Sequence, residues 1–256
     1  MWPKEHGAYG QMAVPLAAAL MAGGVRMPSL CLALAVVAAF VAHEPLLVLL
    51  GRRGARARRE AFARAAGWLA VTATVAFAAG LAGMWTMPEK ARWTLLVPMA
   101  PATLLAAAVA ANREKGVLGE AAAALAFSCA SVPVCLAGGG PTAGAFGIAA
   151  VFAGVFVAET LAVRAMLVAS RGGGDVSAAK RTRAWAVMAA VIAVAGLSAA
   201  WQLDLLSGAA PLAAAPGLVV ALWLAAAPPQ PTRLRQVGWT LVATAIWAGV
   251  VLVVWR

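Results

Sequence analysis

The chain has 256 residues, of which 64% are hydrophobic and only 11% are charged, whereas an average soluble domain has about 25% charged residues. This composition excludes a soluble globular fold and indicates a polytopic membrane protein. The net charge of +11 would suggest a nucleic-acid partner in a soluble protein. Here most basic residues fall in short loops beside apolar segments, where they orient the chain and contact anionic lipid heads. We therefore expect the lipid bilayer, and no nucleic acid, as the partner.

Apolar stretches long enough to cross a bilayer predict an all-α protein with nine transmembrane helices. The first stretch is the weakest, because it carries Gly10, Gln11 and Pro15. The predicted helices are 9–25, 28–50, 65–84, 92–111, 118–137, 142–169, 184–203, 209–227 and 236–255.

The basic residues predict the orientation of these helices. With the N-terminus in the cytoplasm, every Lys and Arg except Arg26, Lys90, Arg92 and Arg256 falls in a cytoplasmic segment. This asymmetry favours a cytoplasmic N-terminus and a C-terminus on the periplasmic or extracellular side.

An eight-residue motif occurs twice. The first copy is 4–11 (KEHGAYGQ), which opens the first helix and ends at Gln11. The second copy is 113–120 (REKGVLGE), which opens the fifth helix and ends at Glu120. In each half the next helix carries one glutamate and precedes a basic segment, 51–64 or 171–183. We therefore predict one transmembrane domain made of two parallel four-helix repeats, about 1–112 and 113–230, followed by a last helix at 236–255.

Glu44 and Glu159 are the repeated glutamates, and both lie inside predicted membrane helices. A carboxylate there costs about 2.5–3.5 kcal/mol on insertion scales, so such residues are paired or face an internal cavity. Two interpretations stay open for Glu44. In the first, Glu44 and His43 line a polar cavity open to the cytoplasm, beside the backbone that Pro45 leaves without a hydrogen bond. In the second, Glu44 pairs with His43 or a nearby Arg and holds two helices together.

Basic residues at the cytoplasmic ends are the candidates for binding an anionic head group. Arg52 and Arg53 either clamp a diphosphate or anchor the loop on anionic lipid. Arg164 follows Glu159 by five residues and shares its helix face poorly, so it either contributes to the site or extends toward the head groups. The remaining substrate-binding candidates come from the repeated motif: Lys4, Glu5, His6, Arg113 and Glu114.

The segment 2–9 (WPKEHGAY) resembles the opening of YwiC-like membrane proteins. Further similar segments are 44–47 (EPLL), 113–115 (REK) before Gly119-Glu120, and 233–239 (RLRQVGW) before the last helix. The resemblance implies a multi-pass protein of the bacterial inner membrane whose activity is unassigned.

The predicted architecture also resembles that of UbiA-type prenyltransferases, with polar motifs at the cytoplasmic ends of the second and sixth helices. That resemblance implies binding of an isoprenoid diphosphate, magnesium as a cofactor and prenyl transfer, with Glu44, Glu159 and His43 as the catalytic candidates. The chain departs from the UbiA pattern because one acid stands in place of each Asp-rich motif, and two carboxylates are too few for the oxygen-rich shells of two magnesium ions. The fold is therefore carried over and the reaction is left open.

Three functions remain open from the sequence. The first is an enzyme or binder that holds an isoprenoid or other anionic lipid in a cytoplasm-facing cavity. The second is a proton-coupled transporter with Glu44 and Glu159 as substrate or proton sites. The third is a non-enzymatic membrane scaffold that assists another complex.

Overall fold

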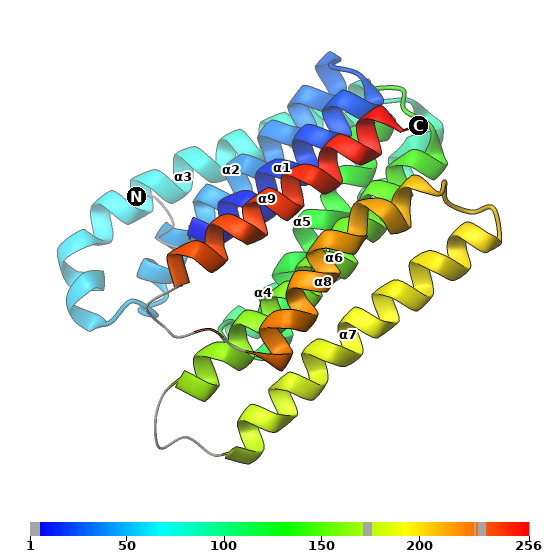
Figure 1. Cartoon of the computed structure of the whole chain (residues 1–256). Coiled ribbons are helices and arrows are strands. Elements are labelled where there is room, and N and C mark those ends of the chain that lie inside the picture. Colours follow the sequence, from blue (N-terminus) through cyan, green and yellow to red (C-terminus); the bar gives the residue numbers. More distant parts are fainter. Residues whose placement is uncertain (1–5, 171–175, 228, 230–233, 256) are drawn as a thin grey trace.

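The computed structural model describes residues 6–170, 176–227, 229 and 234–255. Helices make up most of these residues, and the described ranges contain no β-strand. In chain order they are α1 (His6–Gly23), α2 (Met27–Leu49), α3 (Ala55–Thr86), the 3₁₀ helix η1 (Glu89–Leu95), α4 (Leu96–Ala110), α5 (Val117–Ala137), α6 (Thr142–Ser170), α7 (Val176–Gln202), α8 (Ala209–Ala226) and α9 (Leu234–Val254). The all-α fold and its nine long helices are thereby confirmed for the described part of the chain (Figure 1).

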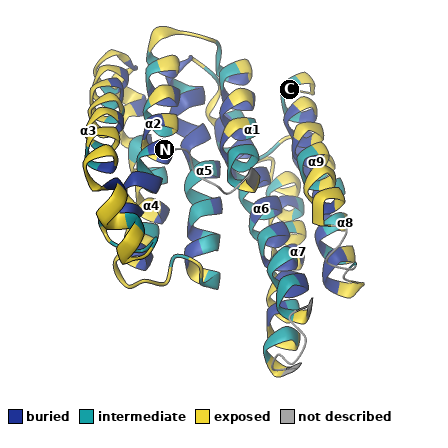
Figure 2. Cartoon of the chain, turned by 90° about the vertical axis from the view of Figure 1, so that its left-hand side faces the viewer, coloured by how far each residue is buried: buried dark blue, intermediate teal, exposed yellow. Residues whose placement is uncertain are grey.

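The helices form a bundle whose interior is built by α5 and α6. More than half of the residues in the apolar segments of these two helices are buried, but fewer than a quarter are buried in those of α3 and α7. Figure 1 shows α3 and α7 at opposite edges of the bundle, and Figure 2 shows how exposed α3 is. α3 packs mainly on α2, and α7 packs mainly on α6 and α8. The exposed faces of α3 and α7 are therefore the surfaces available to lipid.

Eight helical segments of the described chain are long and apolar enough to cross a membrane. α1 is not among them, although it packs beside α5, α9 and α6 and buries Met12, Leu16 and Ala19. The protein is thus a multi-pass membrane protein, while the crossing of α1 stays a prediction.

The basic segments contain more helix than the sequence analysis predicted. α3 begins at Ala55 rather than near 65, and α7 begins at Val176 rather than near 184. Ala, Arg, Lys and Glu are good helix formers, so these segments extend the membrane helices beyond their apolar part. At the start of α3, Ala61 and Ala65 also pack against Val48 of α2, which favours the helical conformation.

Two glycine-containing turns meet at one end of the bundle. A Cβ atom on Gly23 would overlap with the carbonyl oxygen of Cys135, and one on Gly138 would overlap with that of Gly24. The turn after α1 and the turn after α5 are therefore in direct backbone contact, which only glycine allows. These turns occupy corresponding places in the two predicted repeats.

We call the opposite end of the bundle the basic end. It holds the described basic residues of the α2–α3 and α4–α5 connections and of the first turns of α3 and α7, namely Arg52, Arg53, Arg56, Arg58, Arg59, Arg64, Arg113, Lys115, Lys180, Arg181 and Arg183.

Candidate functional site

Glu44 forms an ion pair near the end of α2. Nε of Arg53 donates a hydrogen bond to Oε1 of Glu44 at 3.0 Å, and Nη2 of Arg53 donates to Oε2 at 2.5 Å. The Glu44 side chain is 9% exposed and that of Arg53 is 24% exposed. The intervening turn contains Gly51 and Gly54 with positive φ of 76° and 98°, and this backbone conformation is one that glycine adopts without strain. Of the two interpretations of Glu44, the geometry favours pairing with a nearby arginine.

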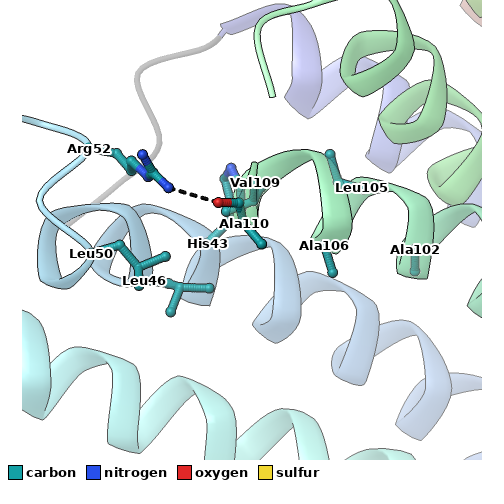
Figure 3. Close-up of a pocket in the computed structure, with 9 residues that line it drawn as sticks. All are labelled: His43, Leu46, Leu50, Arg52, Ala102, Leu105, Ala106, Val109 and Ala110. Carbon is teal, nitrogen blue, oxygen red and sulfur yellow. Dashed lines mark hydrogen bonds between the residues drawn. The ribbon is translucent and has the colours of Figure 1, made fainter. Parts of the chain in front are cut away.

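Arg52 points toward α4 instead. Its Nη2 donates a hydrogen bond of 3.0 Å to the carbonyl oxygen of Ala110, the last residue of α4 (Figure 3). The last carbonyls of a helix lack intrahelical partners and carry partial negative charge, so a guanidinium is favourable there. The Nε of Arg52 is buried and has no hydrogen-bond partner among the described residues. Arg52 is therefore only partly paired within the described chain.

A groove lies between α2 and α4 next to Arg52. Its volume is about 480 Å³, which is within the range of small-molecule sites. Figure 3 shows Leu46 on α2 and Leu50, directly after α2, on one side and residues of α4 on the other. The full lining is His43, Leu46, Leu50, Arg52, Ala102, Leu105, Ala106, Val109 and Ala110. The groove is thus apolar along its length, with a guanidinium and an imidazole as its ionisable groups.

Glu159 lies elsewhere, between α6, α8 and α9. Its side chain is buried, and its Oε1 is 3.0 Å from Oγ1 of Thr244 on α9. Gly217 of α8 lies against it, because a Cβ there would be 3.1 Å from the same Oε1. The bonds of Glu159 and those of Glu44 have no residue in common. The structure therefore gives the two acids separate surroundings.

Three further hydrogen bonds connect α6 to its neighbours. Nη1 of Arg164 donates to Oε1 of Glu120 at 2.8 Å and to the carbonyl oxygen of Lys115 at 2.7 Å. Nε2 of Gln11 donates to Oγ1 of Thr160 at 3.0 Å. Gln11 and Glu120 are the closing residues of the repeated motif, and both contact α6. The sequence analysis singled them out only as motif positions, and Thr244 carried no signal in the sequence.

The other candidate residues are divided between the basic end and the part of the chain that is not described. Arg113 is exposed, and Glu114 has a buried Oε2 without a hydrogen-bond partner in the described ranges. Lys4 and Glu5 lie outside the described residues, as does the side chain of His6. The roles predicted for this set stay predictions.

The described residues do not fit the magnesium site that UbiA-type enzymes imply. Both oxygens of Glu44 accept hydrogen bonds from Arg53, and no three His, Cys, Asp or Glu side chains gather at a metal-sized site within the described ranges. Magnesium needs several oxygen ligands in octahedral geometry, and the side chains around Glu44 do not supply them.

Comparisons with known proteins agree with the first resemblance drawn from the sequence. Residues 2–136 match the family described as YwiC-like protein. A search of curated proteins and a search of solved structures each found no match. The match covers more than half of the 256 residues, and includes α1 to α4, most of α5, the Glu44–Arg53 pair and the α2–α4 groove. The chain therefore belongs to the YwiC-like protein family.

Proposed function

We propose that this YwiC-like protein binds an anionic membrane lipid, with the phosphate at Arg52 and the first part of the chain in the α2–α4 groove. The carrying observation is that an apolar groove ends at the guanidinium of Arg52, which a hydrogen bond from its Nη2 to the carbonyl oxygen of Ala110 holds in place. A phosphate oxygen that accepts a hydrogen bond from this guanidinium would form a charge-assisted bond, which contributes about 1.5–3 kcal/mol.

The shape and chemistry of the groove support a lipid rather than a soluble anion. On α4 the lining runs from Ala102 to Ala110, roughly 12 Å at the rise of an α-helix. At about 480 Å³ the groove accommodates a head group and the beginning of a chain, and the remainder would lie in the bilayer. An isoprenoid phosphate and a phospholipid share this chemistry, so the proposal is for a phosphate on an apolar chain.

The orientation of the site follows from the basic residues. Within the described ranges the basic end carries most of the Lys and Arg side chains, and the opposite end carries Arg26, Lys90 and Arg92. Under the positive-inside rule the basic end lies in the cytoplasm, so the bound phosphate would be at the cytoplasmic side of the inner membrane. The UbiA-like scaffold and its prenyl transfer stay predictions, and the proposal uses neither.

The arrangement of the helices is consistent with two parallel repeats. In such repeats α1 corresponds to α5, α2 to α6 and α4 to α8. The contact of α1 with α6 then has its counterpart in the contact of α5 with α2, and α4 packs on the helix that follows it, α5, as α8 packs on α9. α6 packs closely on α8, with Gly217 against Val155, whereas the groove separates the corresponding helices α2 and α4. We infer that the two halves are related, and that in the second half the close packing of α6 on α8 takes the place of the groove.

Binding can be measured by native mass spectrometry of the purified protein with phosphatidylglycerol and with a polyprenyl phosphate. Phosphatidylcholine and the uncharged polyprenol serve as neutral probes. Arg52→Gln removes the charge at the groove, and a charge-assisted hydrogen bond contributes about 1.5–3 kcal/mol. We therefore expect at least about tenfold weaker binding of the anionic probes.

Two matched controls sharpen this experiment. Arg56→Gln removes an equal charge from the same end at a side chain that is 90% exposed, and it should leave binding almost unchanged. Ala106→Trp fills the groove, whereas Ala107→Trp alters an exposed neighbour that does not line it; only the first should reduce binding. Equal losses in Arg52→Gln and Arg56→Gln, or no preference for phosphate, would contradict the proposal.

A further inference from the structure

Glu159 differs from Glu44 and Glu120 in its partners. Glu44 is paired with Arg53, and Glu120 is paired with Arg164. Glu159 is buried, but it forms no ion pair with a described Lys, Arg or His side chain. A buried, ionised carboxylate without a counter-ion is strongly disfavoured in low dielectric.

The hydroxyl of Thr244 provides an independent argument about the proton. Its Oγ1 is 3.0 Å from Oε1 of Glu159 and 2.9 Å from the carbonyl oxygen of Leu241. A threonine hydroxyl has one hydrogen, and a backbone carbonyl can only accept. If Glu159 were ionised, the two acceptors would compete for that single hydrogen. If Glu159 is protonated, its O–H donates to Thr244 and Thr244 donates to Leu241, so both contacts become full hydrogen bonds.

We propose that Glu159 and Thr244 form a proton-binding site that joins α6 to α9. With the proton bound, a chain of two hydrogen bonds runs from the carboxyl of α6 through the hydroxyl of α9 to its backbone. Loss of the proton leaves an unpaired charge in the bundle and removes one of the two hydrogen bonds. Deprotonation therefore weakens the attachment of α9 to α6.

The helices around Glu159 bring few titratable groups that could take over its role. α8 has none, α9 has only Arg235, and α1 has only His6 and Tyr9. α5 contributes Glu120, which is paired with Arg164 of α6 itself, and its cysteines Cys129 and Cys135. α7 carries its basic residues at its start, at 180, 181 and 183.

Infrared spectroscopy of the protein in lipid nanodiscs tests the proposal, because a protonated carboxyl has its own C=O stretching band. We expect Glu159→Gln to remove one such band at neutral pH and Glu44→Gln to remove none, since Glu44 is paired with Arg53. Raising the pH should convert the Glu159 band into carboxylate bands reversibly. A neutral-pH spectrum that is the same with and without Glu159 would overturn the proposal.

A second variant covers the case in which Glu159→Gln fails to fold. Thr244→Val is nearly isosteric but removes the acceptor of the carboxyl hydrogen, so it should shift the C=O band to higher frequency without abolishing it. Thr240→Val is the matched control, because Thr240 is exposed on the same helix and donates to its own backbone. A Thr244→Val spectrum identical to that of Thr240→Val would refute the Glu159–Thr244 hydrogen bond.

Discussion

The Glu44–Arg53 pair gives the sharpest prediction about stability. Two hydrogen bonds join the side chains, and Glu44 is more buried than Arg53, at 9% against 24% exposed. Removing one member of a buried pair costs about 3–5 kcal/mol, since it leaves the other charge buried alone. Arg53→Gln leaves the more buried charge, that of Glu44, alone, and we expect it to lower the free energy of unfolding by about 2–4 kcal/mol. Glu44→Gln leaves Arg53 alone, and because Arg53 is partly exposed we expect a loss of only about 1–2 kcal/mol.

A double-mutant cycle separates the pair from its surroundings. The double variant Glu44→Gln/Arg53→Gln leaves no unpaired charge, so it should be more stable than Arg53→Gln alone, with a coupling energy of about 2 kcal/mol. The same cycle on Arg56 and Glu60, which are 90% and 63% exposed, should give at most about 0.5 kcal/mol. Denaturant-induced unfolding in mixed micelles, followed by circular dichroism, provides the free energies. A coupling at Glu44–Arg53 no larger than that of the exposed pair would refute this reasoning.

Two further predictions concern helix packing. Gly23→Ala places a methyl group against the carbonyl oxygen of Cys135, closer than van der Waals contact allows, so it should lower the midpoint of thermal unfolding strongly. Gly196→Ala meets no atom within 4 Å and should leave the midpoint unchanged or raise it, since alanine favours a helix by about 0.5–1 kcal/mol; equal effects would contradict the backbone contact. Arg164→Gln removes the bonds to Glu120 and Lys115, so hydrogen exchange at the start of α5 should accelerate, whereas Arg183→Gln should leave it unchanged.

The sequence was informative where the signal is local. Long apolar runs identified the helices, and the gaps between the predicted ranges 9–25 and 28–50 and between 118–137 and 142–169 fall at the turns that the structure shows after α1 and α5. The pairing of Glu44 with an arginine nine residues later was one of two interpretations, because short separations keep the partners close. The boundaries of α3 and α7 were missed because hydropathy marks the bilayer and does not mark the end of a helix.

The sequence by itself thus determined which segments are apolar, where the basic residues gather, and that Glu44 and Glu159 lie inside apolar helices. Only the tertiary structure decided that Thr244, 85 residues away along the chain, is the partner of Glu159, and that α2 and α4 leave a groove beside Arg52. The physical reason lies in the packing of helices in lipid. Contacts between helices depend on small residues and single hydrogen bonds, because lipid tails are as apolar as the helices themselves. In a chain that carries alanine on every helix, such contacts leave no periodic signature in the sequence.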